Sequence, residues 1–99
     1  MVLTVFRSRL NPGVDAEYGV WTARMRELAM AMPGYVSHKA FAAPDGERVT
    51  IVEFDSEEHQ RAWAKLPAHI SAQRAGRDSF YSEYVLMVCT VERERRFKA

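Results

Sequence analysis

The chain has 99 residues, with 14 basic and 13 acidic side chains and a formal net charge of +1. Apolar residues make up 47% and charged residues 27%, which is the balance of a folded globular domain and not of a disordered or fibrous chain. Because the positive and negative charges nearly cancel, the chain has no long-range field to attract nucleic acid, and a general DNA- or RNA-binding role is not expected. The length predicts a single domain, residues 1–99, with one core.

Two observations predict a cytoplasmic protein. The apolar start of the chain is too short for the core of a signal peptide, because Arg7 and Arg9 interrupt it, and no window approaches the ~18 apolar residues of a membrane span. The single cysteine, Cys89, cannot form a disulfide within the chain, so a reducing compartment is the simplest interpretation.

The first third of the chain predicts a strand followed by a helix. Apolar and polar residues alternate over residues 2–10, which is the period of a strand, and Asn11-Pro12-Gly13 ends it. A helix is expected from about Asp15, which either caps it or follows the cap as an acidic residue of the first turn. Pro33-Gly34 ends this helix. Its apolar stripe recurs at spacings of three and four and comprises Tyr18, Trp21, Met25, Leu28 and Met32.

The middle of the chain predicts a β-hairpin and the start of a helix. Residues 35–41 and 48–54 have strand character. Pro44-Asp45-Gly46 between them is a turn, because Pro fixes φ and Gly accepts a positive φ. Asp55 and Glu58 then fit a capping box at the start of a short helix, with Asp55 as the cap.

The last third predicts another helix and a long strand. Pro67 suits the first turn of a helix that runs to about Arg77, and Gly76 weakens the end of that helix. Residues 81–91 form the strand, and the alternating charges of residues 92–96 are expected to extend it into solvent. The complete order, βαββααβ, predicts an α+β, ferredoxin-like fold with a four-stranded antiparallel sheet and helices on one face.

The last strand also predicts a partner, because it is apolar on both faces. One face carries Val85, Met87, Cys89 and Val91, and the other carries Tyr84, Leu86 and Val88. Helices in so short a chain cover only one face of a sheet, and an antiparallel sheet with one wet face should alternate apolar and polar residues. A homodimer through the sheet face opposite the helices is therefore expected. The alternative is a monomer with an exposed apolar edge strand.

Histidine and tryptophan supply the candidate functional residues. His59 and Trp63 are four residues apart and share one face of a helix, and His69 follows across the Leu66-Pro67 break, so the three are expected to face one space above the sheet. Trp63 would offer a flat wall to an aromatic ring, and either histidine would move a proton near neutral pH. The alternative is that Trp63 is core and both histidines are exposed.

Four further residues are candidates for contact with a ligand, although they can also be ordinary core or surface residues. His38 alternates with its strand neighbours so that it can face the helices. Trp21 fits the core stripe of the first helix, and Phe6 lies on the first strand. Arg77 lies near the end of the last predicted helix, where an exposed arginine is the more common situation.

Several kinds of site are not expected, because their motifs are missing. The sequence has no H-E-x-x-H or H-x-x-E-H and no pair of cysteines, which argues against a protein-built metal site. It has no G-x-G-x-x-G or Walker-type loop, so neither bound nucleotide nor flavin is indicated. It has no G-x-S-x-G, so nucleophilic hydrolysis is a weak hypothesis.

A longer pattern covers nearly the whole chain. Its second half consists of Phe54-Asp55-Ser56-Glu57-Glu58, Trp63, Leu66-Pro67, His69, Ala72-Gln73, Gly76-Arg77, Phe80-Tyr81 and Tyr84. Its first half consists of the opening strand, Pro12-Gly13 and Pro33-Gly34-Tyr35. This pattern resembles the antibiotic biosynthesis monooxygenase (ABM) family of the dimeric α/β-barrel superfamily.

The resemblance implies a dimer of ferredoxin-like subunits whose sheets pack into a barrel. In some relatives it implies oxygenation of polycyclic phenols or quinols by O2 without metal or flavin. It also implies a polar group four residues before a tryptophan and another six residues after it. These positions are His59, Trp63 and His69 here, whereas quinone-forming relatives often carry asparagine and tyrosine.

The expected function is therefore a cofactor-independent monooxygenase of an electron-rich aromatic, phenol or quinol. His69, His59 and Trp63 are its expected catalytic residues, and the substrate-binding set is His38, Arg77, Phe6 and Trp21. Two alternatives stay open. One is a non-catalytic, dimeric ligand-binding or stress-associated domain. The other is heme binding or degradation, although heme-degrading relatives carry an asparagine on the first strand that this chain lacks.

Overall fold

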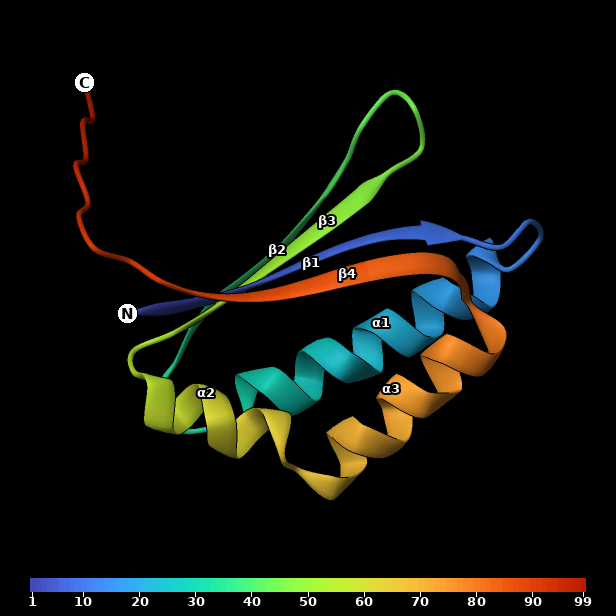
Figure 1. Cartoon of the computed structure of the whole chain (residues 1–99), viewed down its shortest axis with the longest axis horizontal. Helices are drawn as coiled ribbons and strands as arrows, with labels where there is room; N and C mark the ends of the chain where they lie inside the picture. Colours follow the sequence, from blue (N-terminus) through green and yellow to red (C-terminus); the bar gives the residue numbers. More distant parts are fainter.

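The sheet has four antiparallel strands in the order β2-β3-β1-β4 in the computed structural model, which describes residues 1–99. The strands are β1 (Val2–Leu10), β2 (Tyr35–Ala42), β3 (Arg48–Phe54) and β4 (Tyr81–Thr90). The helices are α1 (Asp15–Met30), α2 (Glu57–Ala64) and α3 (Pro67–Ser79). All three helices lie on one face of the sheet (Figure 1). The expected ferredoxin-like α+β fold is confirmed.

The strand register decides which residues of β1 face the helices. Thr4 stands opposite Val52 of β3 and Val88 of β4. Val2, Thr4 and Ser8 are each 3% exposed, so this side of β1 is sealed by the helices. The main core lies at one end of that space and comprises Ala29, Val52, Phe54 and Trp63, with Met32 and Tyr35 packed against them.

The helix starts differ in part from the sequence expectation. Ser56, and not Asp55, caps α2: its backbone is extended and its hydroxyl accepts a hydrogen bond from the backbone N–H of His59 at 3.2 Å. Asp55 is held elsewhere, because its backbone N–H donates to the carbonyl of Gly34 and its carboxylate meets the His59 imidazole. At α1 no side chain caps the helix, and Asp15 is the acidic residue of its first turn.

The end of the chain also differs from the expectation. β4 ends at Thr90, and the residues beyond it form no strand. The backbone N–H of Val91 donates to the carbonyl of Met1 at 3.1 Å, and the tail then leaves the body of the protein (Figure 1). Phe97 in this tail is 92% exposed. The alternating charges therefore mark an arm without a strand partner in its own chain.

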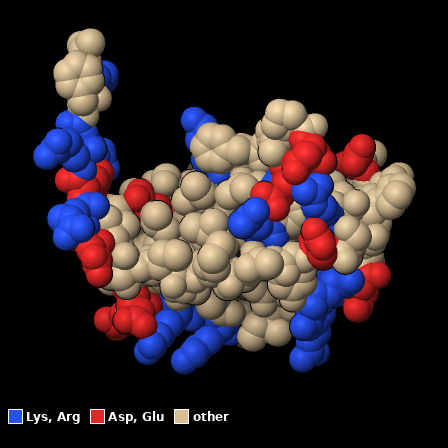
Figure 2. All heavy atoms as spheres, turned by 45° about the horizontal axis from the view of Figure 1, so that its top comes forward, with Lys and Arg blue, Asp and Glu red and all other residues tan.

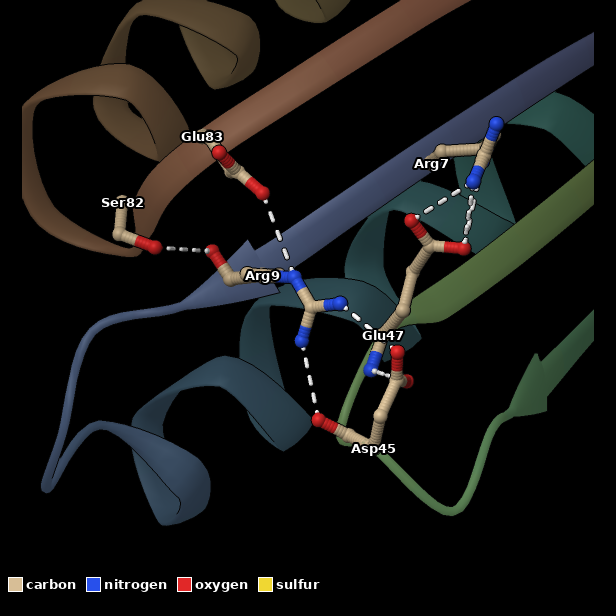
Figure 3. A network of polar contacts seen from close by, with 6 residues as sticks. All are labelled: Arg7, Arg9, Asp45, Glu47, Ser82 and Glu83. Carbon is tan, nitrogen blue, oxygen red and sulfur yellow. Dashed lines mark hydrogen bonds and ion pairs between the residues drawn. The ribbon is translucent and has the colours of Figure 1, made fainter.

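The sheet face opposite the helices has an apolar middle and charged residues around it. Val85 and Met87 of β4 are 56% and 38% exposed on this face. Figure 2 shows a broad uncharged surface across its middle, with a cluster of charged side chains toward one end and further charges at its edges and along the tail. The charged end is a network in which Arg7 pairs with Glu47 (2.9 Å) and Arg9 pairs with both Asp45 (2.9 Å) and Glu83 (3.2 Å) (Figure 3). None of the three helices has the length and apolar character needed to cross a membrane.

Candidate functional site

A cavity of about 360 Å³ lies between the sheet and the helices. All four strands and all three helices contribute to its lining. Six of its 19 lining residues are aromatic, namely Phe6, Tyr18, Trp21, Trp63, Tyr81 and Tyr84. A space of this size with flat apolar walls suits a small aromatic molecule.

Two histidines occupy one part of the cavity wall. His69, near the start of α3, is 5% exposed, and its ring meets Trp63 edge to face at a centroid distance of 4.3 Å. His38 lies on β2 directly opposite Val52, so its alternation turns it toward the helices, as the sequence suggested. Pro67 starts α3 two residues before His69, and the break between α2 and α3 brings His69 back against Trp63.

Both histidines are held in the neutral state. Burial lowers the pKa of His69, and no acidic partner opposes that effect. Burial also lowers the pKa of His38, with a further contribution from the positive charge of Arg26. The Nδ1 atom of each ring is buried and has no hydrogen-bond partner. A neutral imidazole with a free nitrogen can accept a proton near pH 7.

The tryptophans have the same unused hydrogen-bonding capacity. Nε1 of Trp21 and Nε1 of Trp63 are buried without an acceptor. A buried donor left unpaired costs about 1–3 kcal/mol, so such groups are rare in proteins. The side chains of all four unpartnered ring nitrogens line this one cavity. The arrangement therefore leaves donors for an oxygen-bearing guest.

The other part of the wall is formed by tyrosines and an arginine. The Tyr81 hydroxyl donates to the Tyr18 hydroxyl at 3.4 Å, and burial raises the pKa of Tyr81. The guanidinium of Arg48, on β3, lies 5.5 Å from the centre of the Tyr18 ring. Arg77 reaches the lining from the last turn of α3. Tyr81 therefore stays neutral, and the positive charges belong to the arginines.

His59 does not belong to this cavity, contrary to the sequence expectation. Its Nδ1 lies 2.6 Å from Asp55 Oδ1, and its ring packs over Gly34. His59 is the third residue of α2, where the chain has just left β3, and Asp55 at the end of β3 holds the ring outside the sheet–helix space. Gln60 turns inward instead, is 5% exposed and donates to the Thr4 hydroxyl at 3.3 Å.

The other predicted site residues come together. Trp63, His69, His38, Trp21, Phe6 and Arg77 all line the cavity. Trp63 also belongs to the main core, as the structural interpretation of this residue expected. Sequence reasoning missed Arg48, although its even spacing before Val52 on β3 was a usable signal for the same strand face. No three His, Cys, Asp or Glu side chains lie together as a metal-ligand set.

The fold and cavity define a class: a small ferredoxin-like domain with an aromatic-lined chamber between its sheet and helices. The model of the family described as "Antibiotic biosynthesis monooxygenase" matches residues 1–75. The protein YqjZ of Bacillus subtilis (strain 168) is 31% identical over 84 residues, which are 85% of this chain and 74% of that protein. The chain belongs to the antibiotic biosynthesis monooxygenase family.

Solved structures share the fold at lower identity. SnoaB, described as a cofactor-independent oxygenase from Streptomyces nogalater, superposes with a TM-score of 0.79 at 22% identity over 94% of each chain. A structure from Deinococcus radiodurans assigned to the same family has a TM-score of 0.87 at 10% identity over the whole of both chains. Rv0793 from Mycobacterium tuberculosis has a TM-score of 0.82 at 16% identity, covering 96% of this chain and 98% of that one.

Proposed function

We propose that the protein is a cofactor-independent monooxygenase that uses O2 to oxidise an electron-rich phenol or quinol. The observation that carries the proposal is the aromatic-lined cavity with two histidines, buried His69 and half-buried His38, both kept neutral by their surroundings. Family membership and the fold shared with SnoaB, described as a cofactor-independent oxygenase, support it.

The chemistry needs a base and a dry aromatic chamber. Trp63, Trp21 and Phe6 hold the substrate ring, and His69 removes the phenolic proton through Nε2. The resulting phenolate gives its electrons to O2, and a carbon of the ring forms a bond to oxygen as a hydroperoxide. Loss of water then gives the quinone: the substrate loses two hydrogens and gains one oxygen atom, and the second oxygen atom leaves as water. His38 provides a second proton-handling group in the cavity wall.

Oxygen uptake with 1-naphthol or a reduced naphthohydroquinone tests this function. We expect one O2 consumed per naphthol oxidised, and a drop of about 10²-fold or more in the rate for His69→Gln, because a positioned base typically contributes that much. The matched control is His59→Gln, which removes a histidine outside the cavity and should keep the rate. Equal losses in both variants, or no uptake with any such substrate, would contradict the proposal.

Two outcomes would favour the alternatives. Ligand-induced stabilisation without oxygen uptake would indicate a binding domain without catalysis. A shifted Soret band on titration with heme would indicate a heme protein.

We also propose that the functional unit is a homodimer through the sheet face opposite the helices. The apolar middle of this face, the charges of both signs around it and the arm beyond Thr90 support this (Figure 2). Val85→Glu would place a charge in the contact and should convert the dimer to monomer in analytical ultracentrifugation. Val20→Glu is the control, because Val20 is 75% exposed on α1. A wild-type protein that sediments as a monomer would refute it.

A further inference from the structure

Positive charge gathers at one end of the cavity without any negative charge to balance it. Arg48 and Arg77 both line the cavity, and no aspartate or glutamate does. Neither arginine is within ion-pair distance of a carboxylate, whereas Arg7 and Arg9 on the other sheet face are both paired. The cavity wall therefore carries two positive charges, half-buried Arg48 and exposed Arg77, that have no carboxylate partner in the chain.

The chain path places both arginines at the same end. Arg48 is the first residue of β3, and its guanidinium rests on Tyr18, near the start of α1. Arg77 lies in the last turn of α3, beside the turn into β4. These four segments meet at the end of the sheet where β1 finishes and β4 begins (Figure 1). His69 and Trp63 lie toward the other end, at the break between α2 and α3.

Two independent elements give the same separation between the histidines and the arginines. Along α3, eight residues separate His69 from Arg77, which is about 12 Å at ~1.5 Å per residue. Along β3, four residues separate Arg48 from Val52, the pairing partner of His38, which is about 13 Å at ~3.3 Å per residue. This separation along the helix allows Arg77 to serve a different group of the ligand from the one that meets His69.

We propose that the substrate is an aromatic anion that carries a carboxylate on the side away from its reacting hydroxyl, and that Arg48 and Arg77 bind this carboxylate. The inference rests on the proposed function for the hydroxyl end and adds the substrate class at the other end. Arginine suits the task because its guanidinium offers parallel donors to both carboxylate oxygens and stacks on aromatic rings, as Arg48 does on Tyr18. The aromatic walls between the two ends hold the ring system.

The affinities of three naphthols distinguish this proposal from simple aromatic binding. They are measured without oxygen by isothermal titration calorimetry on the full chain. 6-Hydroxy-2-naphthoate carries its hydroxyl and carboxylate at opposite ends, 3-hydroxy-2-naphthoate carries them on adjacent carbons, and 2-naphthol has no carboxylate. We expect the opposite-end isomer to bind at least about tenfold more tightly than either of the others, which corresponds to one charge-assisted hydrogen bond. Equal affinity of the three, or no binding of any of them, would overturn the proposal.

Variants assign the preference to the two arginines. Arg48→Met with Arg77→Met should remove the preference while keeping the affinity for 2-naphthol, which shows that the cavity is still folded. Arg74→Met is the matched control, because Arg74 lies on α3 outside the cavity lining and should keep the preference. A preference that survives in the double variant would refute the arginine clamp. Oxygen uptake without a preference would refute the clamp alone, and a preference without uptake would refute the monooxygenase activity alone.

Discussion

The buried histidines predict how the stability of the fold depends on pH. Burial lowers the pKa of His38 and of His69 below the ordinary value of 6.5. The unfolded chain, in which both rings are exposed, therefore binds protons first as the pH falls. Stability is complete above about pH 6.5 and is lost progressively as the pH drops toward the folded-state pKa values.

The magnitude follows from the number of protons involved. Each histidine that is protonated in the unfolded state and neutral in the folded state lowers the free energy of unfolding by up to about 1.4 kcal/mol per pH unit. His38 and His69 together give a slope of up to about 2.7 kcal/mol per pH unit. Total stabilities of small domains are about 5–15 kcal/mol, so the effect is large enough to measure.

Urea unfolding followed by tryptophan fluorescence, at fixed protein concentration between about pH 5 and pH 7.5, provides the assay. The range stops near pH 5 because carboxylates begin to titrate below it. His38→Gln and His69→Gln should each remove about half of the slope, and the double variant should be nearly flat. An unchanged slope in the double variant would show that these rings are not kept neutral by burial, and the case for His69 as a base would fall with it.

Two further predictions concern glycines, each with a matched control. Gly34→Ala and Gly13→Ala both force a residue with a Cβ to a φ of +80°, which costs about 1 kcal/mol each. Only at Gly34 would the new Cβ also lie 2.5 Å from the carboxylate of Asp55, so Gly34→Ala should lower the free energy of unfolding in urea by about 1 kcal/mol more than Gly13→Ala. Equal losses in the two variants would contradict this. At Gly19 in α1 a new Cβ would have nothing within 4 Å, so Gly19→Ala should stabilise the fold by about 1 kcal/mol. At Gly76 in α3 the new Cβ would lie 2.9 Å from a cavity-lining tyrosine ring, so Gly76→Ala should lose that gain and weaken naphthol binding. Equal stabilisation by both variants would refute the close contact at Gly76.

Local signals were sufficient for the fold. Strand alternation and helix spacing are properties of neighbouring residues, so the order of elements and the limits of β1 and β3 were predictable. Gly76 misled the prediction for α3, which continues to Ser79, because the glycine is there for close packing and not to end the helix. The capping residue of α2 was shifted by one position, since Ser56 and Asp55 both suit a cap and only the backbone decides between them.

The site was predictable only where a strand or helix pattern fixed the direction of a side chain. His38 followed from alternation, and Trp63 and His69 followed from the break between two helices. His59 failed because the four-residue rule places it beside Trp63 but says nothing of Asp55, which captures the ring from the end of another element. Arg48 could have been found in the same way as His38, because its even spacing before Val52 places it on the strand face that lines the cavity.

The cavity is the region where the chain departs from the rules that stabilise the rest of the fold. Ala29, Val52 and Phe54 form an ordinary apolar core, each at most 4% exposed. Around the cavity, by contrast, four ring nitrogens lack partners and two arginines lack counter-ions. Each unpaired donor lowers stability, and apolar replacements of similar shape would remove the cost. Such departures are expected where a site is kept for a ligand, because the missing partners are then supplied by the molecule that binds.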